Sequence, residues 1–233
     1  EISACLVGSE MCIRDSVGLI SAAFVMLYPL LWMVSASIRP SDQVFTSMGL
    51  WVKDPTLQNF TTGWTSVGSV DFGTFFRNSA IIAVLAVIGN VVSCSLAAYA
   101  FARLRFRGKK VWFALMLGTI MLPYQVLLIP QYILFSNLGW LDTFLPLVVP
   151  KFLATDAFFV FLLAQFFRVL PKELTEAARL DGCGYFGTYL RVIMPLSVPA
   201  LATTAAFTFI WSWNDFLHPL IYLTSPQNYT VPI

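Results

Sequence analysis

Long stretches without charge constrain this chain more than any other feature of its sequence. An α-helix needs about 20 predominantly apolar residues to cross the hydrocarbon core of a bilayer. Five windows meet that length, at about residues 17–37, 77–103, 111–135, 145–167 and 196–223. Spanning β-strands would be about half as long and would alternate in polarity. The windows therefore predict an all-α, polytopic transmembrane helical bundle.

The composition supports a membrane protein and argues against other classes. Apolar residues make up 58% of the chain and charged residues 11%, with a mean hydropathy of +0.76. A soluble domain carries about 25% charged residues, so this chain cannot form an ordinary hydrated surface. The net charge of +2 is too small to indicate nucleic acid as a partner.

Basic residues in the loops predict the orientation of the chain. The loop at residues 103–110 carries five basic residues and no acidic one, and the loop after the fourth window carries Arg168, Lys172, Arg179 and Arg191. The positive-inside rule places both loops in the cytoplasm. Two windows separate them, so parity also puts them on one side. The loop at residues 38–76 is then expected outside.

Both ends are expected to differ from a complete membrane domain. Residues 1–16 lack the basic start and compact apolar segment of a signal peptide, and they resemble translated adapter sequence. We set them aside as a non-native tail and assign residues 17–233 to one transmembrane domain. That domain is expected to be truncated at its C-terminus, with five spans present of six.

The polar loop after the fourth window has the features of two short helices. Pro171 suits a first helical turn, and Glu173 and Glu176 lie near the positive end of that helix. Leu174, Ala177 and Ala178 are spaced to form one apolar face, and Gly182 suits a left-handed C-terminal cap. A second helix is expected over residues 185–194, with Gly184 as its N-cap and its end before Pro195. An amphipathic helix on the membrane surface is the plainer alternative.

The spacing within this loop resembles the permeases of binding-protein-dependent ABC importers. In that family the pattern Glu-Ala-Ala, three residues, Gly, nine residues, Ile-x-Leu-Pro docks on the ATPase. Glu176, Ala177, Ala178, Gly182 and Pro195 match it, while Val192 and Met194 replace the isoleucine and leucine by other apolar residues. The resemblance implies an ATPase-docking loop at about residues 168–195. It also implies Glu176 as a charged anchor, with Asp181 capping or bracing the turn.

Shorter motifs are similar to the carbohydrate branch of the family, and to the smaller membrane subunit of maltose-type transporters. They are Ser37-Ile38-Arg39-Pro40, Tyr99-Ala100-Phe101-Ala102-Arg103, Met121-Leu122-Pro123 and Trp213-Asn214-Asp215-Phe216. The resemblance implies a sugar importer in a prokaryotic cytoplasmic membrane. Its expected partners are a second permease, two ATPase subunits, an extracytoplasmic sugar-binding protein and the lipid bilayer. ATP and Mg²⁺ are expected on the ATPase, and no cofactor on this chain.

Few polar residues lie inside the windows, and these are candidates for a translocation pathway. They are Gln125, Asp156, Asn214 and Asp215, although hydrogen bonding between helices is the default role of such residues. Lys151 lies five residues before Asp156, so we expect the two on different helix faces, with Lys151 reaching outward. No phosphate-binding loop or nucleophile–base pair occurs. The sequence predicts no catalytic residue and no metal site.

Three other functions stay open. An importer of glycerol phosphate or another small polar solute would place basic residues along the pathway. An ATP-independent channel or ion-coupled carrier would use paired charges inside the membrane. A membrane scaffold would need no pathway and would leave the docking loop unexplained.

Overall fold

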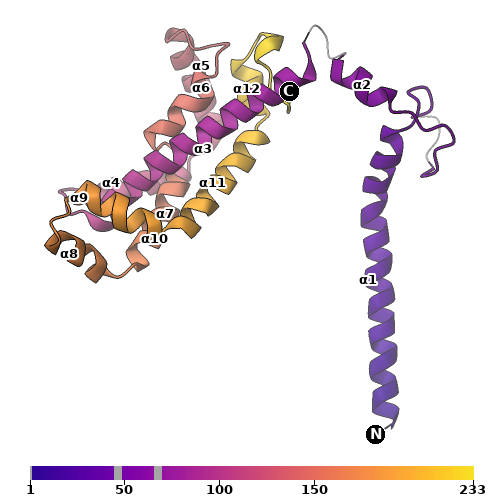
Figure 1. Ribbon diagram of the computed structural model, residues 1–233, viewed down its shortest axis with the longest axis horizontal. Coiled ribbons are helices and arrows are strands. Elements are labelled where there is room, and N and C mark those ends of the chain that lie inside the picture. Colours follow the sequence, from indigo (N-terminus) through magenta and orange to yellow (C-terminus); the bar gives the residue numbers. More distant parts are fainter. Residues whose placement is uncertain (1, 45–48, 66–69) are drawn as a thin grey trace. The chain divides into compact units, whose positions relative to one another are not determined.

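The computed structural model describes residues 2–44, 49–65 and 70–233, with side chains from residue 16 onward. These residues form helices, turns and irregular segments, and no strand occurs among them (Figure 1). The chain divides into two compact units, residues 1–71 and residues 72–233. Each is described by itself.

The first unit contains one long apolar helix and one short helix. Helix α1 is Ile2–Ser37 and helix α2 is Gln58–Thr65. The backbone of residues 2–16, set aside above, is thus helical, and the candidate membrane span begins at Ser16. None of that span's apolar window is buried within the protein. A helix that is apolar all round and uncovered requires an apolar environment, which confirms the first window as a candidate span.

A buried arginine organises the turn that follows α1. The side chain of Arg39 is 1% exposed and donates to the carbonyl of Gly49 and to the hydroxyl of Ser35. Asn59 donates to the carbonyls of Ser37 and Arg39. The bond to Ser37 satisfies a carbonyl at the helix C-terminus, which otherwise lacks a partner.

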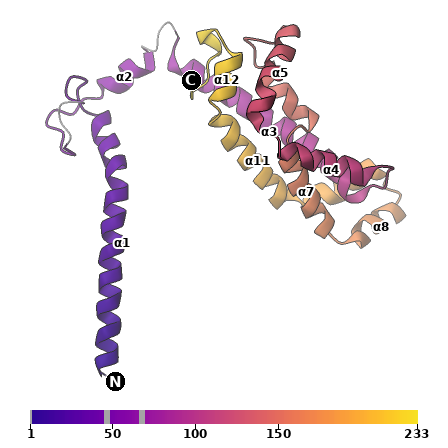
Figure 2. The same ribbon diagram turned by 180° about the vertical axis from the view of Figure 1, so that it is seen from behind.

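The second unit is a bundle around helix α3, Phe72–Arg103. Helices α7 and α11 pack along it, as Figures 1 and 2 show from opposite sides. The other elements are α4 (Lys109–Ile120), α5 (Tyr124–Asn137), α6 (Leu145–Val148), the 3₁₀ helix η1 (Val149–Leu153), α7 (Ala157–Val169), α8 (Lys172–Leu180), α9 (Tyr185–Thr188), the π-helix η2 (Tyr189–Ile193), α10 (Met194–Leu196), α11 (Val198–Trp213), α12 (Leu217–Tyr222) and the 3₁₀ helix η3 (Pro226–Asn228).

Two buried clusters occupy opposite ends of this unit. One packs Phe159, Leu163 and Phe167 of α7 against Cys94 and Ala98 of α3. The other, near α5, α6 and α12, contains Ile82, Phe135, Leu147, Val148, Tyr222 and Leu223. The clusters fix α3 to its neighbours at both ends.

Small residues let the neighbours approach α3 closely. Ala83, Ala86 and Ala98 are fully buried. A Cβ added at Gly89 would lie 2.6 Å from the ring of Phe152 in η1. Close packing through small residues is typical of membrane helices.

Three of the five windows, each predicted as one span, are broken in the structure. Residues 111–135 form α4 and α5, which bend by 100° at the break before Pro123. Residues 145–167 are interrupted by η1 and by Ala154, whose φ is +53°. The window at residues 196–223 breaks after Trp213. Proline removes an amide donor and clashes with the preceding turn, which explains the first break and contributes through Pro150 to the second.

The number of candidate spans equals the number of windows if each bent pair of helices is counted as one span. Within the described residues, three helices are long and apolar enough to cross a membrane, or up to five if each of two bent pairs counts as one span. The second bent pair joins Tyr185–Leu196 to Val198–Trp213 at 80°. The polytopic helical fold predicted from the sequence is confirmed.

Candidate functional site

Helix α8 begins the loop that the sequence predicts to dock on a partner. Pro171 lies immediately before its first residue, with φ of −55°, so the chain enters the helix already in a suitable conformation. Its inner face consists of Thr175 and Ala178, which are buried. Of the three residues predicted to form one apolar face, Leu174 and Ala177 are exposed, whereas Ala178 packs against the protein.

Gly182 ends α8 in the left-handed conformation that the sequence predicts. Its φ is +80°, and its amide donates to the carbonyl of Arg179 at 3.0 Å. The amide of Cys183 donates to the carbonyl of Ala178 at 2.9 Å. This pair of bonds is a Schellman motif, and a residue with a side chain is disfavoured at its left-handed position. The turn after α8 is thus set by backbone geometry.

The second helix of the loop begins as predicted but continues further. Gly184 is its N-cap, and helical conformation runs through α9, η2 and α10 to Leu196. The predicted end before Pro195 is wrong. The preceding turns widen to a π-helix, in which the amide of Met194 donates to the carbonyl of Tyr189. Proline at position 195 has no amide to donate, and the wider turn lets the helix include it.

This second helix is braced against α3. The hydroxyl of Tyr99 donates to the carbonyl of Tyr185 at 3.0 Å, and the hydroxyls of Ser95 and Tyr189 lie 2.7 Å apart. The rings of Tyr99 and Tyr189 are 5.4 Å apart, and Ile193 is fully buried. A displacement of the loop would therefore be passed to α3 through hydrogen bonds and ring packing.

Most of the residues predicted to dock are exposed. Glu176, Ala177, Asp181, Gly182 and Pro195 are exposed, while Ala178 is buried. Within the part of the chain that the structure describes, neither Glu176 nor Asp181 has an ion-pair partner. Large apolar side chains accompany them, with Leu180 90% exposed and Phe186 64% exposed. Mixed apolar and charged surface on a rigid turn is suited to protein contact.

A cavity of about 420 Å³ lies where the three interrupted windows meet. Its lining draws on all three breaks: Tyr124 and Gln131 of α5, Lys151, Thr155 and Asp156 of the second break, and Trp211, Ser212, Asp215 and His218 of the third. Irregular backbone at membrane depth occurs where it is buried in protein or lines a cavity. Discontinuous helices form substrate sites in many transporters. This cavity is the candidate translocation pathway.

Two charge pairs line the cavity. Lys151 Nζ lies 2.8 Å from Asp156 Oδ2, and His218 Nδ1 lies 2.7 Å from Asp215 Oδ2. The expectation that Lys151 and Asp156 occupy different faces, with the lysine reaching outward, is wrong. It assumed a straight α-helix, whereas η1 and the turn at Ala154 bring the two side chains together.

The four pathway residues named from the sequence divide into two pairs. Asp156 and Asp215 line the cavity, whereas Gln125 and Asn214 are exposed and do not. Asn214 donates instead to the carbonyl of Ile210. Sequence reasoning missed Gln131 and His218, which also line the cavity. The spacing of His218, three residues after Asp215, was the available signal, because residues so spaced can meet across one turn.

Comparison with known protein families adds a decisive observation. Residues 89–233 match the family described as the binding-protein-dependent transport system inner membrane component. The chain belongs to this family. It is a multi-pass membrane permease of the ABC importer class, as the docking-loop pattern predicted.

Individual relatives are similar over most of the chain. The chain is 35% identical to the arabinooligosaccharide transport permease AraQ of Halalkalibacterium halodurans, covering 94% of this chain and 78% of that protein. It is 34% identical to the trehalose/maltose permease MalG of Thermococcus litoralis, and the match covers 93% of this chain and 77% of that protein. It is also 35% identical to the sn-glycerol-3-phosphate permease UgpE of Yersinia pestis, and the match covers 87% of this chain and 73% of that protein. The relatives thus include permeases for sugars and for glycerol phosphate.

A solved structure shares the fold. The chain superposes with a TM-score of 0.82 on a chain of a bacterial ABC transporter involved in the import of the acidic polysaccharide alginate. The two are 25% identical, and the match covers 96% of this chain and 77% of that one. The fold described above is therefore that of an ABC importer permease.

Proposed function

We propose that this permease forms half of the translocation pathway of an ATP-driven sugar importer and couples that pathway to a separate ATPase. The observation that carries the proposal is the junction of the docking loop with the bundle. One helix, from α9 to α10, presents the exposed turn at Gly182 at one end and leads into α11 at the other. The same helix is tied to α3 by Tyr99 and Tyr189.

In this mechanism the ATPase moves the loop and the loop moves the bundle. Glu176 is the charged anchor for a basic residue of the ATPase, and the exposed Leu180 supplies apolar contact. Because α11 continues from the loop and reaches the cavity at Trp211, movement of α8 to α10 changes the shape of the cavity. ATP and Mg²⁺ act on the ATPase, and a second permease completes the pathway. A binding protein outside the cytoplasmic membrane delivers the sugar.

The charges of the cavity support a neutral polyhydroxyl solute over glycerol phosphate. Its lining contains two carboxylates, one lysine and one histidine, and the lysine is already paired with a carboxylate. A phosphate would therefore meet no unpaired lysine or arginine in this lining. Carboxylates accept hydrogen bonds from sugar hydroxyls, and Trp211 offers an aromatic face. Small-molecule sites combine such polar groups with apolar walls.

An ion-coupled carrier is the second candidate, and the same two charge pairs favour it. Paired ionisable groups at membrane depth often mark proton or ion pathways. The exposed docking loop weighs against this candidate, because a carrier that works without ATP has no partner for that loop.

The deciding experiment is purification of the permease with its associated proteins, followed by uptake in proteoliposomes. We expect an ATPase and a second permease to co-purify, and sugar uptake to require internal ATP. Changing Glu176 and Gly182 together should remove the ATPase. Uptake that persists without ATP and responds to a proton or sodium gradient would replace the importer with the carrier.

A further inference from the structure

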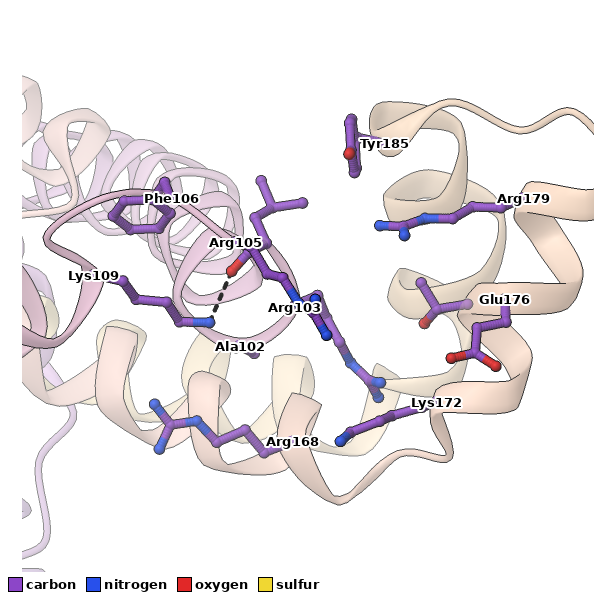
Figure 3. A pocket seen from close by; sticks show the side chains of 12 residues that line it. Ala102, Arg103, Arg105, Phe106, Lys109, Arg168, Lys172, Glu176, Arg179 and Tyr185 are labelled. Carbon is purple, nitrogen blue, oxygen red and sulfur yellow. Dashed lines mark hydrogen bonds between the residues drawn. The ribbon is translucent and has the colours of Figure 1, made fainter.

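A second, larger cavity lies beside the docking loop, outside the pathway. It measures about 870 Å³ and is formed by the loop after α3 on one side and by the end of α7 and helix α8 on the other. Six basic residues line it, Arg103, Arg105, Lys109, Arg168, Lys172 and Arg179, together with one acidic residue, Glu176. Figure 3 shows the basic side chains of the two sides facing one another across the space.

The protein itself supplies little to balance this charge. None of the six cations lies within ion-pair distance of a carboxylate among the described residues. Two of them donate to backbone carbonyls, Arg103 to Leu170 at 2.6 Å and Lys109 to Leu104 at 2.8 Å. Two others lie over aromatic rings, Arg168 over Phe113 and Arg179 over Tyr185, which leaves their positive charge in place. Glu173, on α8 but not in the lining, acts on Arg103 only at longer range. Like charges gathered in this way repel one another unless an anion is bound.

Two buried polar atoms on residues that line the cavity also lack a partner. They are Nε of Arg103 and Oγ1 of Thr175, neither of which forms a hydrogen bond with the described residues. Buried donors without partners are uncommon in folded proteins and call for an explanation. A guanidinium N–H and a hydroxyl are both suited to an oxyanion ligand.

The cavity lies at the ends of candidate membrane spans. Arg103 is the last residue of one candidate span, Arg168 is in the last turn of another, and Lys109 begins the bent pair α4–α5. Large apolar side chains next to these residues are open to the surroundings, with Trp112 61% exposed and Val169 84% exposed. Tryptophan beside basic residues at the ends of spans is typical of the membrane interface.

We infer that this basic cavity binds the phosphate of an anionic phospholipid from the cytoplasmic leaflet. The cations would hold the phosphate, and the acyl chains would run past the exposed apolar side chains into the bilayer. Basic pockets between spans on the cytoplasmic side are suited to such headgroups. The bound lipid would connect the loop after α3 to α8, and so stabilise the docking loop from the membrane side.

The test uses the full-length permease in nanodiscs that contain phosphatidylcholine with a minority of phosphatidylglycerol. Lipid retained after transfer to mild detergent is measured by native mass spectrometry. We expect about one phosphatidylglycerol per chain. The double variant Arg105→Gln with Arg168→Gln should bind it roughly 25-fold more weakly, because each surface cation contributes about fivefold to anionic-lipid binding.

A matched control removes two charges that lie in the same loop region but outside the lining. Arg107 and Lys110 are exposed and do not line the cavity. The Arg107→Gln and Lys110→Gln double variant should therefore retain the lipid. Thermal unfolding in phosphatidylcholine checks that both double variants fold. The single variant Arg105→Gln gives a milder second measurement, because this side chain forms no hydrogen bond or ion pair with the described residues.

Several results would overturn the inference. Equal retention of phosphatidylcholine would do so, as would equal losses in the two double variants, which would indicate general surface charge. Displacement of the lipid by millimolar inorganic phosphate would assign the site to a free phosphate. If the lipid binds only after the ATPase is removed, the cavity is instead the binding site of an acidic part of the ATPase. None of these outcomes depends on sugar uptake, so the inference and the proposed function can fail separately.

Discussion

The two ends of the bundle of residues 72–233 differ in whether the chain itself provides partners for an acidic side chain. At the end formed by α5, α6 and α12, Asp142 accepts hydrogen bonds from the amides of Thr224 and Ser225, the hydroxyl of Ser225 and the amide group of Asn228. At the end formed by α8 to α10, Glu176 has no ion-pair partner among the described residues and Leu180 is exposed.

We call the end formed by α5, α6 and α12 the closed end, because the chain bonds to itself there, and the end formed by α8 to α10 the docking end, because its surface is available to a partner. The bonds at Asp142 join the turn before α6 to the segment after α12, more than 80 residues away, so the chain secures itself there. The Schellman turn at Gly182 shapes the other end but leaves its charges and apolar side chains uncovered. Substitutions at the closed end should therefore change stability, and substitutions at the docking end should change assembly.

Charge reversal at the docking end should have the largest effect. We expect Glu176→Lys to weaken ATPase association at least about tenfold, in the range found when a charged interface group loses its partner. The measurement is the amount of ATPase that co-purifies at a fixed salt concentration. Glu173→Lys is the control, because it adds the same charge three residues earlier on the same helix and outside the cavity lining. Equal losses in both variants would indicate a general charge effect and not an anchor.

Removing the charge at the closed end should reduce stability instead. Asp142→Asn keeps a side chain that tolerates the residue's φ of +59° but loses several charge-assisted hydrogen bonds. We expect the free energy of unfolding to fall by about 1–2 kcal/mol, with no change in ATPase co-purification. Asp181→Asn, at the exposed docking turn, should change the free energy of unfolding by less than about 0.5 kcal/mol. If the Asp142 variant assembles poorly but unfolds normally, the distinction between the ends is wrong.

A glycine substitution tests whether the docking turn is set by the backbone. A side chain at Gly182 has open space but must adopt a φ of +80°, so Gly182→Ala should cost about 1 kcal/mol. Gly187→Ala, within α9, meets only ordinary contact at 3.7 Å and should be neutral or stabilising. Thermal unfolding of both variants gives the comparison. Equal melting temperatures would show that the left-handed turn is not required.

Acidification should affect the closed end in a small, defined way. Hydrogen bonds from Ser225, then from the amide of Thr224, hold the pKa of the Asp142 carboxyl well below its usual range. Since an unfolded chain protonates this group near pH 4, its contribution is complete above that pH and decreases as the pH falls towards the folded-state value. Below about pH 4, wild type should therefore lose stability faster than Asp142→Asn. Parallel pH curves for the two proteins would contradict this.

The sequence alone determined the polytopic helical fold, because membrane-spanning helices need long apolar windows whatever their partners. It also determined the cap at Gly182, since local backbone geometry selects glycine there. Two of the four pathway candidates, Asp156 and Asp215, do line the cavity, and the motif spacing indicated the permease family.

Only the tertiary structure decided where the spans break and what meets at the breaks. Hydropathy measures whether a segment prefers lipid, and it is nearly the same for a straight helix and a bent one. The pairing of Lys151 with Asp156 and the position of His218 depend on those bends. The basic cavity likewise joins loops that lie more than 60 residues apart, as the bond from Arg103 to Leu170 shows. Such proximity follows from packing around α3, which no local pattern in the sequence records.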